Sequence, residues 1–186
     1  MRIIGGKLRG KTINPPSGYK ARPTTDFAKE GLFNSLDNEY EFDGLSVLDL
    51  FGGTGSIAFE FASRGAGSVI SVEMNPVNAA FIKRTADSLG LSGTVQVVRH
   101  NVFDFIPLCT KRFDIVFADP PYAIEGLDTL PDRILGRGIV YEGGYLILEH
   151  PAEYDFAAHP SFVKERKYGN VHFSWFSPSA SAVSES

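Results

Sequence analysis

The residues best suited to chemistry stand in one tetrapeptide, Asp119-Pro120-Pro121-Tyr122, directly after the apolar run 113–118. The exocyclic amine of a purine is a poor nucleophile because its lone pair is delocalised into the ring, so a site that uses this amine must draw on its N–H groups. Asp119 can supply a carboxylate and Pro120 a backbone carbonyl as two fixed acceptors, while the paired prolines stiffen the loop. Tyr122 would stack on an extruded base. The tetrapeptide therefore predicts Asp119, Pro120 and Tyr122 as catalytic residues; the alternative is a tight turn at a strand end.

A second group of candidate residues surrounds a glycine-rich turn with the sequence DLFGGTGS at 49–56. Glycines at such a place let a strand turn sharply into a helix and let a ligand approach the backbone. Gly53, Gly55 and Ala58 also satisfy the dinucleotide pattern, with Glu73 twenty residues after Gly53. The turn predicts a nucleotide-like ligand and leaves NAD and S-adenosylmethionine both open.

Asp49 favours S-adenosylmethionine over NAD. An acid at this turn repels the pyrophosphate of NAD but suits a ligand with an ammonium and a sulfonium. Glu73 is placed to accept hydrogen bonds from two ribose hydroxyls, and Met74 to cover the adenine. The alternative is a surface acid and a core methionine. Asn101 would bind the adenine amine, with Val102 or Phe103 on the ring. The predicted contacts of S-adenosylmethionine are Asp49, Phe51, Gly53, Gly55, Glu73, Met74, Asn101 and Val102.

Charge is distributed unevenly along the chain. The net charge is −4, yet the first 25 residues carry six basic residues and no acidic one, leaving 12 basic against 22 acidic residues elsewhere. Such a basic arm suits nucleic-acid phosphates, although a merely solvated N-terminus has the same charge. The predicted nucleic-acid contacts are Arg2, Lys7, Arg9, Lys11 and Arg22.

The elements that must position these residues alternate along the chain. Short apolar runs at 45–51, 68–73, 94–99, 113–119 and 143–150 are typical of strands in a parallel sheet covered on both faces. Helical stretches separate them at 56–64, 76–89, 102–108 and 127–138, and a helix over 24–36 has Thr25 or Asp26 as its N-cap. The pattern predicts an α/β fold with an open sheet. Its doubly wound, mostly parallel sheet has seven strands, with an antiparallel C-terminal edge hairpin at 162–176 and a small basic N-terminal hairpin at 2–13.

The length of 186 residues fits one globular domain. The predicted organisation is a basic arm over 1–22, the main domain over 23–177, and a disordered tail over 178–186. No apolar run is long enough for a membrane span or a signal peptide, so a cytoplasmic protein is expected. Cys109 is the single cysteine and the four histidines lack metal-ligand spacing, so neither a disulfide nor a metal site is predicted.

Several motifs together resemble the bacterial small-subunit ribosomal RNA methyltransferase D family. They are MRIIGGKLRG, RPTTD followed by EGLFN, LDLFGGTG, SRGA, VEMN and DPPY, and they cover nearly the whole chain. The opening arm with RPTTD is the most specific part. The resemblance implies that Asp119, Pro120 and Tyr122 form an amine pocket, that the residues around the glycine turn hold the cofactor, and that the arm binds ribosomal RNA. It also implies a Rossmann-like class I methyltransferase fold and the N2 amine of a guanine as methyl acceptor.

Two departures from the family and several alternatives stay open. Phe27 stands where the family often has arginine, and Gly52 and Thr54 replace the commoner alanine and serine of the glycine turn. DPPY alone leaves guanine and adenine open, so an adenine-N6 methyltransferase of DNA or RNA is the alternative, followed by a NAD-dependent oxidoreductase and a binding module without catalysis. The modified nucleotide, the choice between naked RNA and a partly assembled ribosomal subunit, and the oligomeric state are also left open.

Overall fold

The computed structural model describes residues 1–20 and 24–178, which fall into two compact units, Met1–Val102 and Phe103–Ser186. The predicted contact residue Arg22, and all of the predicted tail except Pro178, lie outside the described residues.

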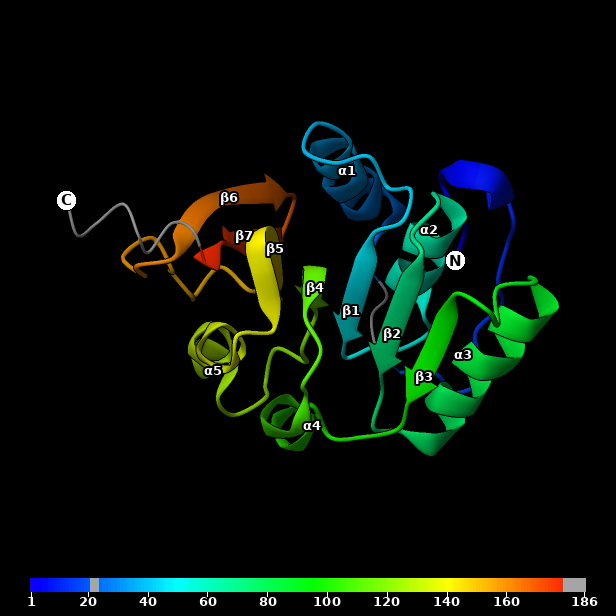
Figure 1. Ribbon diagram of the computed structural model, residues 1–186. Coiled ribbons are helices and arrows are strands. Elements are labelled where there is room, and N and C mark those ends of the chain that lie inside the picture. The colour runs from blue at the N-terminus through cyan, green and yellow to red at the C-terminus, as the bar shows by residue number, and fades with distance from the viewer. Residues whose placement is uncertain (21–23, 179–186) are drawn as a thin grey trace. The chain divides into compact units, whose positions relative to one another are not determined.

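The first unit contains a three-stranded parallel sheet with the order β3-β2-β1 (Figure 1). Its strands are β1 (Ser46–Leu50), β2 (Ser68–Val72) and β3 (Val95–Val98). Its helices are α1 (Asp26–Asp37), α2 (Ser56–Ser63) and α3 (Pro76–Ser88). Helix α2 packs against β1 and β2, and α3 packs against β3. All residues of α2 after Ser56 are buried, which explains why its sequence is apolar on every side.

Local sequence signals set the helix starts in this unit. The Thr25 side chain accepts a hydrogen bond from Ala28 N at 3.1 Å and so caps α1, which selects Thr25 rather than Asp26 as the N-cap. Asn75 caps α3 through Val77 N and Asn78 N, and Pro76 occupies its first turn as predicted. These caps satisfy backbone donors that a helix end otherwise leaves unpaired.

The N-terminal arm (residues 1–13) closes on itself in antiparallel fashion. One isolated bridge joins Arg2 to Thr12, and a 3-10 turn η1 (Gly6–Leu8) lies between them. The predicted hairpin is therefore realised as a single bridge and a turn rather than as two strands. The reason is the close approach of the turn to α2: Gly6 has φ +75, and a Cβ there would lie 2.0 Å from Ser63 O.

A buried ion cluster anchors the N-terminal arm to α1 and α2. Glu60 is fully buried, and its carboxylate accepts hydrogen bonds from Ile4 N at 3.0 Å and Gly5 N at 2.8 Å. Lys29, 1% exposed, lies 3.3 Å from Glu60, and Arg64 Nε lies 3.1 Å from it. Burial lowers the pKa of Lys29, and the carboxylate of Glu60 opposes that shift.

The second unit contains a four-stranded sheet with the order β4-β5-β7-β6 (Figure 1). Its strands are β4 (Phe113–Ala118), β5 (Val140–His150), β6 (Phe162–Tyr168) and β7 (Val171–Phe176). Strands β4 and β5 are parallel, whereas β7 is antiparallel to β5 and β6. Its helical segments are η2 (Leu127–Thr129) and α5 (Leu130–Arg137), and α4 (Val102–Leu108) begins on the last residue of the first unit.

The prediction of a mostly parallel α/β fold with seven strands and an antiparallel C-terminal hairpin is confirmed. Strand β5 begins three residues earlier than predicted, at Val140, and its register with β4 shifts between Phe113 and Ile115. Gly143, with φ +80, lies in this irregular part of β5. Within the described residues, no helix is long and apolar enough to cross a membrane.

Candidate functional site

The glycine turn bends sharply where β1 ends. Phe51 has φ +64 and is the one non-glycine residue with positive φ in the described part of the chain; Gly53 and Gly55 follow with φ +60 and +82. Such conformations are uncommon for residues with a side chain and concentrate at functional sites. Gly55 then serves as the N-cap of α2. The turn therefore presents backbone, rather than side chains, to a ligand.

Glu73 joins the glycine turn to the end of β2. Gly53 N donates to Glu73 Oε2 at 2.6 Å, and Asn75 N donates to Glu73 Oε1 at 2.9 Å. Two backbone donors thus fix the carboxylate beside the turn. The structure brings Glu73 and Gly53 together as the spacing predicted.

Asp49 is buried on β1, with 2% of its surface exposed. Burial raises the pKa of its carboxyl to about 7; the hydrogen bond from Ser71 Oγ, at 3.3 Å, opposes this, and the charge of Glu73 adds to it. Ser71 is also the partner of Asp49 in the register of β1 and β2. A cation that reached Asp49 would therefore stabilise its charged form.

Packing explains why residue 52 is a glycine, which the sequence alone did not reveal. A Cβ at this position would lie 2.1 Å from Ser71 Oγ, the hydroxyl that donates to Asp49. The absence of a side chain at position 52 therefore leaves room for the Ser71 hydroxyl. Gly53 has a similar neighbour, because a Cβ there would lie 2.8 Å from Tyr19 Oη. Tyr19 is a candidate residue that the sequence analysis missed.

The remaining predicted cofactor residues lie after β2 and β3. Met74 is 62% exposed, and Asn101 Nδ2 lies 3.6 Å from Met74 Sδ, so the two side chains are neighbours. Val102 is 4% exposed, as the first residue of α4. The arrows of β1, β2 and β3 end on the same side of the first unit (Figure 1), so the loops that follow these strands share one edge.

The predicted catalytic loop follows β4 in the second unit. Asp119 comes directly after Ala118, the last residue of the strand, and Pro120 is buried. Tyr122 is 43% exposed, and its hydroxyl donates to Glu149 Oε1 at 3.0 Å. The tip of the ring is therefore anchored while part of the ring remains accessible.

Glu149 is a further candidate residue that sequence reasoning missed. It is 5% exposed, and it follows Leu148, which pairs with Ala118 in the parallel register of β5 and β4. Because paired residues on parallel strands advance together, Glu149 and Asp119 occupy equivalent positions at the carboxyl edge of this pair. The signal for Glu149 is an acidic residue that ends a continuous apolar strand, YLILE.

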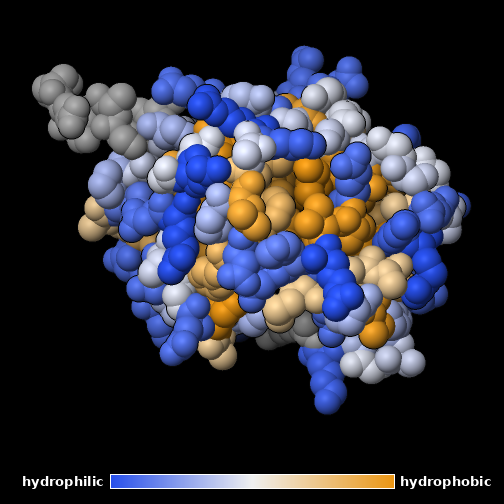
Figure 2. Space-filling model, turned by 60° about the horizontal axis from the view of Figure 1, so that its bottom comes forward, coloured by the Kyte–Doolittle hydropathy of each residue, from blue (hydrophilic) through white to orange (hydrophobic). Residues whose placement is uncertain are grey.

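Apolar surface is available on the face drawn in Figure 2, where hydrophobic side chains gather near the middle and hydrophilic ones surround them. Met74, Tyr122 and Phe27 are among the large apolar side chains that the described chain exposes. Exposed apolar groups of this kind suit the flat faces of nucleobases. Among the described residues, no group of three or more His, Cys, Asp or Glu side chains could hold a metal ion.

Comparison with known proteins places the chain in a family and finds relatives over its whole length. The family model described as conserved hypothetical protein 95 matches residues 1–177. The ribosomal RNA small subunit methyltransferase D of Escherichia coli K12 is 29% identical over 189 residues, which cover 100% of this chain and 93% of that protein. A solved structure of a hypothetical protein from Thermus thermophilus is 31% identical, with a TM-score of 0.83 over 95% of this chain and 99% of that one.

A more distant structure shows likeness of fold alone. It is a methyltransferase from Thiobacillus denitrificans that depends on S-adenosylmethionine and was solved with S-adenosyl-L-homocysteine. It is 19% identical to this chain, with a TM-score of 0.58 over 73% of this chain and 52% of that one. The fold class predicted from the sequence agrees with this likeness.

Proposed function

This chain belongs to the conserved hypothetical protein 95 family, and we propose from its similarity to named relatives that it is an S-adenosylmethionine-dependent methyltransferase of small-subunit ribosomal RNA. The full-length relationship to the Escherichia coli enzyme supports the RNA substrate. We further propose the N2 amine of a guanine as the methyl acceptor. The observation that carries an exocyclic amine as acceptor is the loop after β4, in which Asp119 and Pro120 offer two acceptors and Tyr122 a ring; the choice of guanine over adenine rests on the resemblance to the small-subunit methyltransferase D family.

The residues of the first unit fit the proposed cofactor. Asp49 and Glu73 are both acidic, and the charge of Glu73 raises the pKa of Asp49, so a pyrophosphate would meet unfavourable charge here. An ammonium and a sulfonium would instead relieve it. Glu73, fixed by two backbone donors, would accept hydrogen bonds from ribose hydroxyls, and Met74 with Asn101 would contact the adenine. This charge pattern favours S-adenosylmethionine over NAD.

The residues of the second unit fit an amine acceptor. S-adenosylmethionine, when bound, supplies an electrophilic methyl group on its sulfonium. The Asp119 carboxylate and the Pro120 carbonyl would accept the amine N–H groups and so keep the nitrogen lone pair available for attack. The methylated cationic amine is acidic, so its excess proton leaves without a strong base. Asp119, Pro120 and Tyr122 would be the catalytic residues.

The target base must leave any helix before its amine can reach these acceptors. Tyr122 would stack on the extruded base, and such stacking contributes on the order of 1 to 3 kcal/mol per base. The Tyr122 hydroxyl donates a hydrogen bond to Glu149 at 3.0 Å, and this bond restricts the ring before a base binds. Stacking would therefore cost less side-chain entropy than it would with a free ring.

The test of the proposed function is methyl transfer from labelled S-adenosylmethionine to unmodified small-subunit ribosomal RNA, offered as naked RNA and as subunit particles. Labelled N2-methylguanosine in the nucleoside analysis would support cofactor, reaction and base together, and the better substrate would show whether ribosomal proteins assist. Label in adenine would favour the N6 alternative. Tight binding of NADH without transfer would favour an oxidoreductase.

We expect the affinity for S-adenosylmethionine to rise about tenfold between pH 6 and pH 8. The pKa of Asp49 is raised to about 7, so the carboxyl is mostly protonated at pH 6, and a cationic ligand must displace that proton before it gains the charge. Above pH 8 the carboxylate is already formed and the rise should level off. Isothermal titration calorimetry across this range measures the change.

Asp49→Asn is the matched control for this pH dependence. The variant should bind S-adenosylmethionine more weakly at pH 8. Its affinity should not rise between pH 6 and pH 8, except for the change caused by titration of the ligand's own amine. The folded pKa of Asp49 exceeds its unfolded value of 3.8, so this group lowers stability progressively from pH 4 to pH 7, and Asp49→Asn should melt at a higher temperature than the parent at pH 8. A variant with the parent's pH profile would contradict the role of Asp49.

We propose that the basic arm binds RNA phosphates and that residues 23–177 form the methyltransferase domain. Replacing Lys7, Arg9 and Lys11 by alanine should weaken RNA binding. The slope of log K against log salt should also become shallower by about 2, because each of the three lost phosphate contacts contributes roughly 0.7 to the slope on a single strand. Binding measured by fluorescence anisotropy at several salt concentrations gives the slope. An unchanged slope would assign the arm another role.

A further inference from the structure

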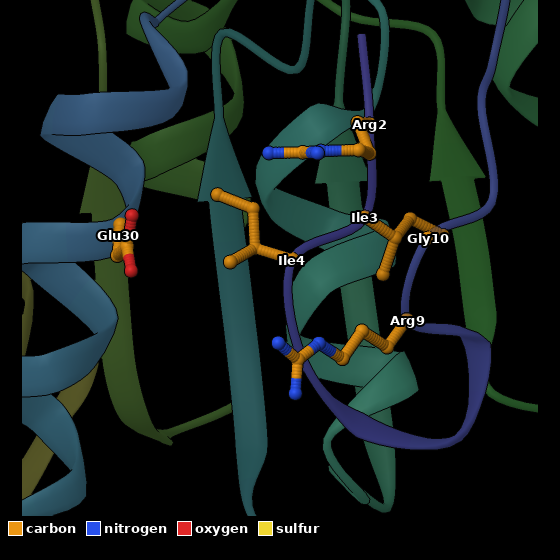
Figure 3. Close-up of a pocket in the computed structure, with 6 residues that line it drawn as sticks. All are labelled: Arg2, Ile3, Ile4, Arg9, Gly10 and Glu30. Atoms are coloured by element: carbon orange, nitrogen blue, oxygen red, sulfur yellow. The ribbon is translucent and has the colours of Figure 1, made fainter.

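A small cavity lies between the N-terminal arm and helix α1, outside the residues assigned to cofactor and base. Its volume is about 140 Å³. Figure 3 shows Arg2 and Arg9 reaching from the arm toward α1, with Ile4 between them and Glu30 on the helix opposite. All of these residues belong to the first unit.

The two arginines form one cationic wall. The guanidinium of Arg2 lies 3.6 Å from Asp26 Oδ2, and their side chains are 59% and 49% exposed, so this pair is solvated and exchanges readily with another anion. Arg9 is exposed and lies on the same side of the arm as Arg2. Two guanidinium groups offer several N–H donors in fixed planes, which suits the oxygens of a phosphate.

Glu30 sets a second requirement on the occupant. A carboxylate opposite two arginines disfavours a simple anion, and it favours a group that presents a hydrogen-bond donor on one side and negative charge on the other. A ribonucleotide has both, in its phosphate and its 2′-hydroxyl, whereas a deoxyribonucleotide lacks the donor. Phe27 precedes Glu30 by three residues on α1, so it lies on the same helical face, and it is 66% exposed. Its ring offers a stacking surface for the attached base.

We propose that this cavity binds one nucleotide of the RNA substrate, with its phosphate on the guanidinium groups that face the cavity and its 2′-hydroxyl on Glu30. The proposal rests on the proposed RNA substrate and adds a discrete site for a nucleotide other than the modified one. The proposal assigns Arg2 and Arg9 a role that Lys7 and Lys11 lack. The two lysines carry the same charge on the same arm, but they do not line the cavity.

The test compares Arg2→Ala/Arg9→Ala with Lys7→Ala/Lys11→Ala as a charge-matched control. Binding of a short oligouridine is followed by fluorescence anisotropy, so the result does not depend on methyl transfer and stands apart from the test of the proposed function. Both variants should flatten the salt dependence equally, but the arginine variant should lose at least about tenfold more affinity, since it alone removes donors aimed at one phosphate. Equal losses of affinity would overturn the proposed site.

Glu30→Ala tests the ribose part of the proposal. The parent should bind oligouridine more tightly than its 2′-deoxy counterpart, and Glu30→Ala should lower that ratio several-fold, because the acceptor of the 2′-hydroxyl is removed. Loss of a negative charge raises the affinity for both oligonucleotides, so the ratio is the informative quantity. Glu30 is exposed, so the fold should tolerate the change, and circular dichroism checks it. An unchanged ratio would overturn the assignment of Glu30.

Discussion

Asp119→Ala is expected to lower the rate of methyl transfer at least about a hundredfold and to leave the affinity for S-adenosylmethionine nearly unchanged. The carboxylate would accept an N–H of the target amine most strongly when positive charge develops on the nitrogen, so its removal acts on the transition state. The cofactor contacts proposed here, such as Asp49 and Glu73, lie elsewhere in the chain. Single-turnover transfer to saturating RNA and calorimetric titration of the cofactor measure the two quantities separately.

Two companion variants sharpen this result. Asp119→Asn keeps an acceptor oxygen without the charge, and its rate should fall between those of the parent and Asp119→Ala. Asp104→Ala removes an exposed carboxylate from α4 of the same unit, and its rate should stay close to that of the parent. If Asp119→Ala transfers methyl groups as fast as Asp104→Ala does, Asp119 has no part in the chemistry.

The strands and their order of appearance could be predicted from the sequence because local patterns specify them. Asp49 lies on a strand as predicted, and Glu73 and Asp119 come directly after strands. The C-terminal hairpin turns at Gly169, whose φ is +62. The resemblance to the small-subunit methyltransferase D family is likewise confirmed, by the family match over residues 1–177 together with the full-length similarity to the Escherichia coli enzyme of that name.

The form of the N-terminal arm could not be predicted from its own residues. Alternation around Gly5 and Gly6 predicted a hairpin, but glycine at position 6 is required by α2, more than fifty residues further along the chain. A Cβ on Gly6 would lie 2.0 Å from the backbone oxygen of Ser63 at the end of α2. Close approach of distant segments leaves no periodic trace in the sequence, and for this reason the single bridge was missed.

Parts of the candidate site also depend on contacts across the sheet. Glu149 enters the site through the register of β4 and β5, and Ser71 through its pairing with Asp49. A spacing rule such as that between Gly53 and Glu73 applies within one strand, turn and helix unit, but register between strands follows from tertiary packing. Local motifs therefore predicted Asp49 and Asp119, but not the neighbours that hold or tune them.

The buried ion cluster was missed for a related reason, although it leaves a trace. Glu60 is the one charged residue inside the apolar helix sequence SIAFEFAS, and an isolated acid there must find a partner if it is buried. The partner, Lys29, lies on α1, beyond the reach of any helical spacing rule. Such an acid in an all-apolar helix is thus a signal for a buried ion pair, and only the partner's identity requires the structure.

Glu60→Gln is expected to lower the free energy of unfolding by about 3–5 kcal/mol, because it leaves the ammonium of Lys29 buried without its counterion. The loss should shrink as the pH rises from 7 toward 10. Burial already depresses the pKa of Lys29 below its usual 10.5, and without Glu60 the folded protein would lose that proton earlier still. The unfolded chain then binds more protons than the folded one, so stability increases with pH in this window. Urea denaturation at several pH values measures the effect.

The double variant Lys29→Met/Glu60→Gln tests whether the ion pair itself is responsible. It removes the buried ammonium together with the carboxylate, so it should recover part of the stability that Glu60→Gln loses, and its own free energy of unfolding should lack the rise between pH 7 and pH 10 that Glu60→Gln shows. The amide oxygen of glutamine can still accept from Ile4 N or Gly5 N, so the N-terminal arm should stay docked. If the double variant is as unstable as the sum of its single changes, the cluster holds the arm through backbone hydrogen bonds rather than through charge.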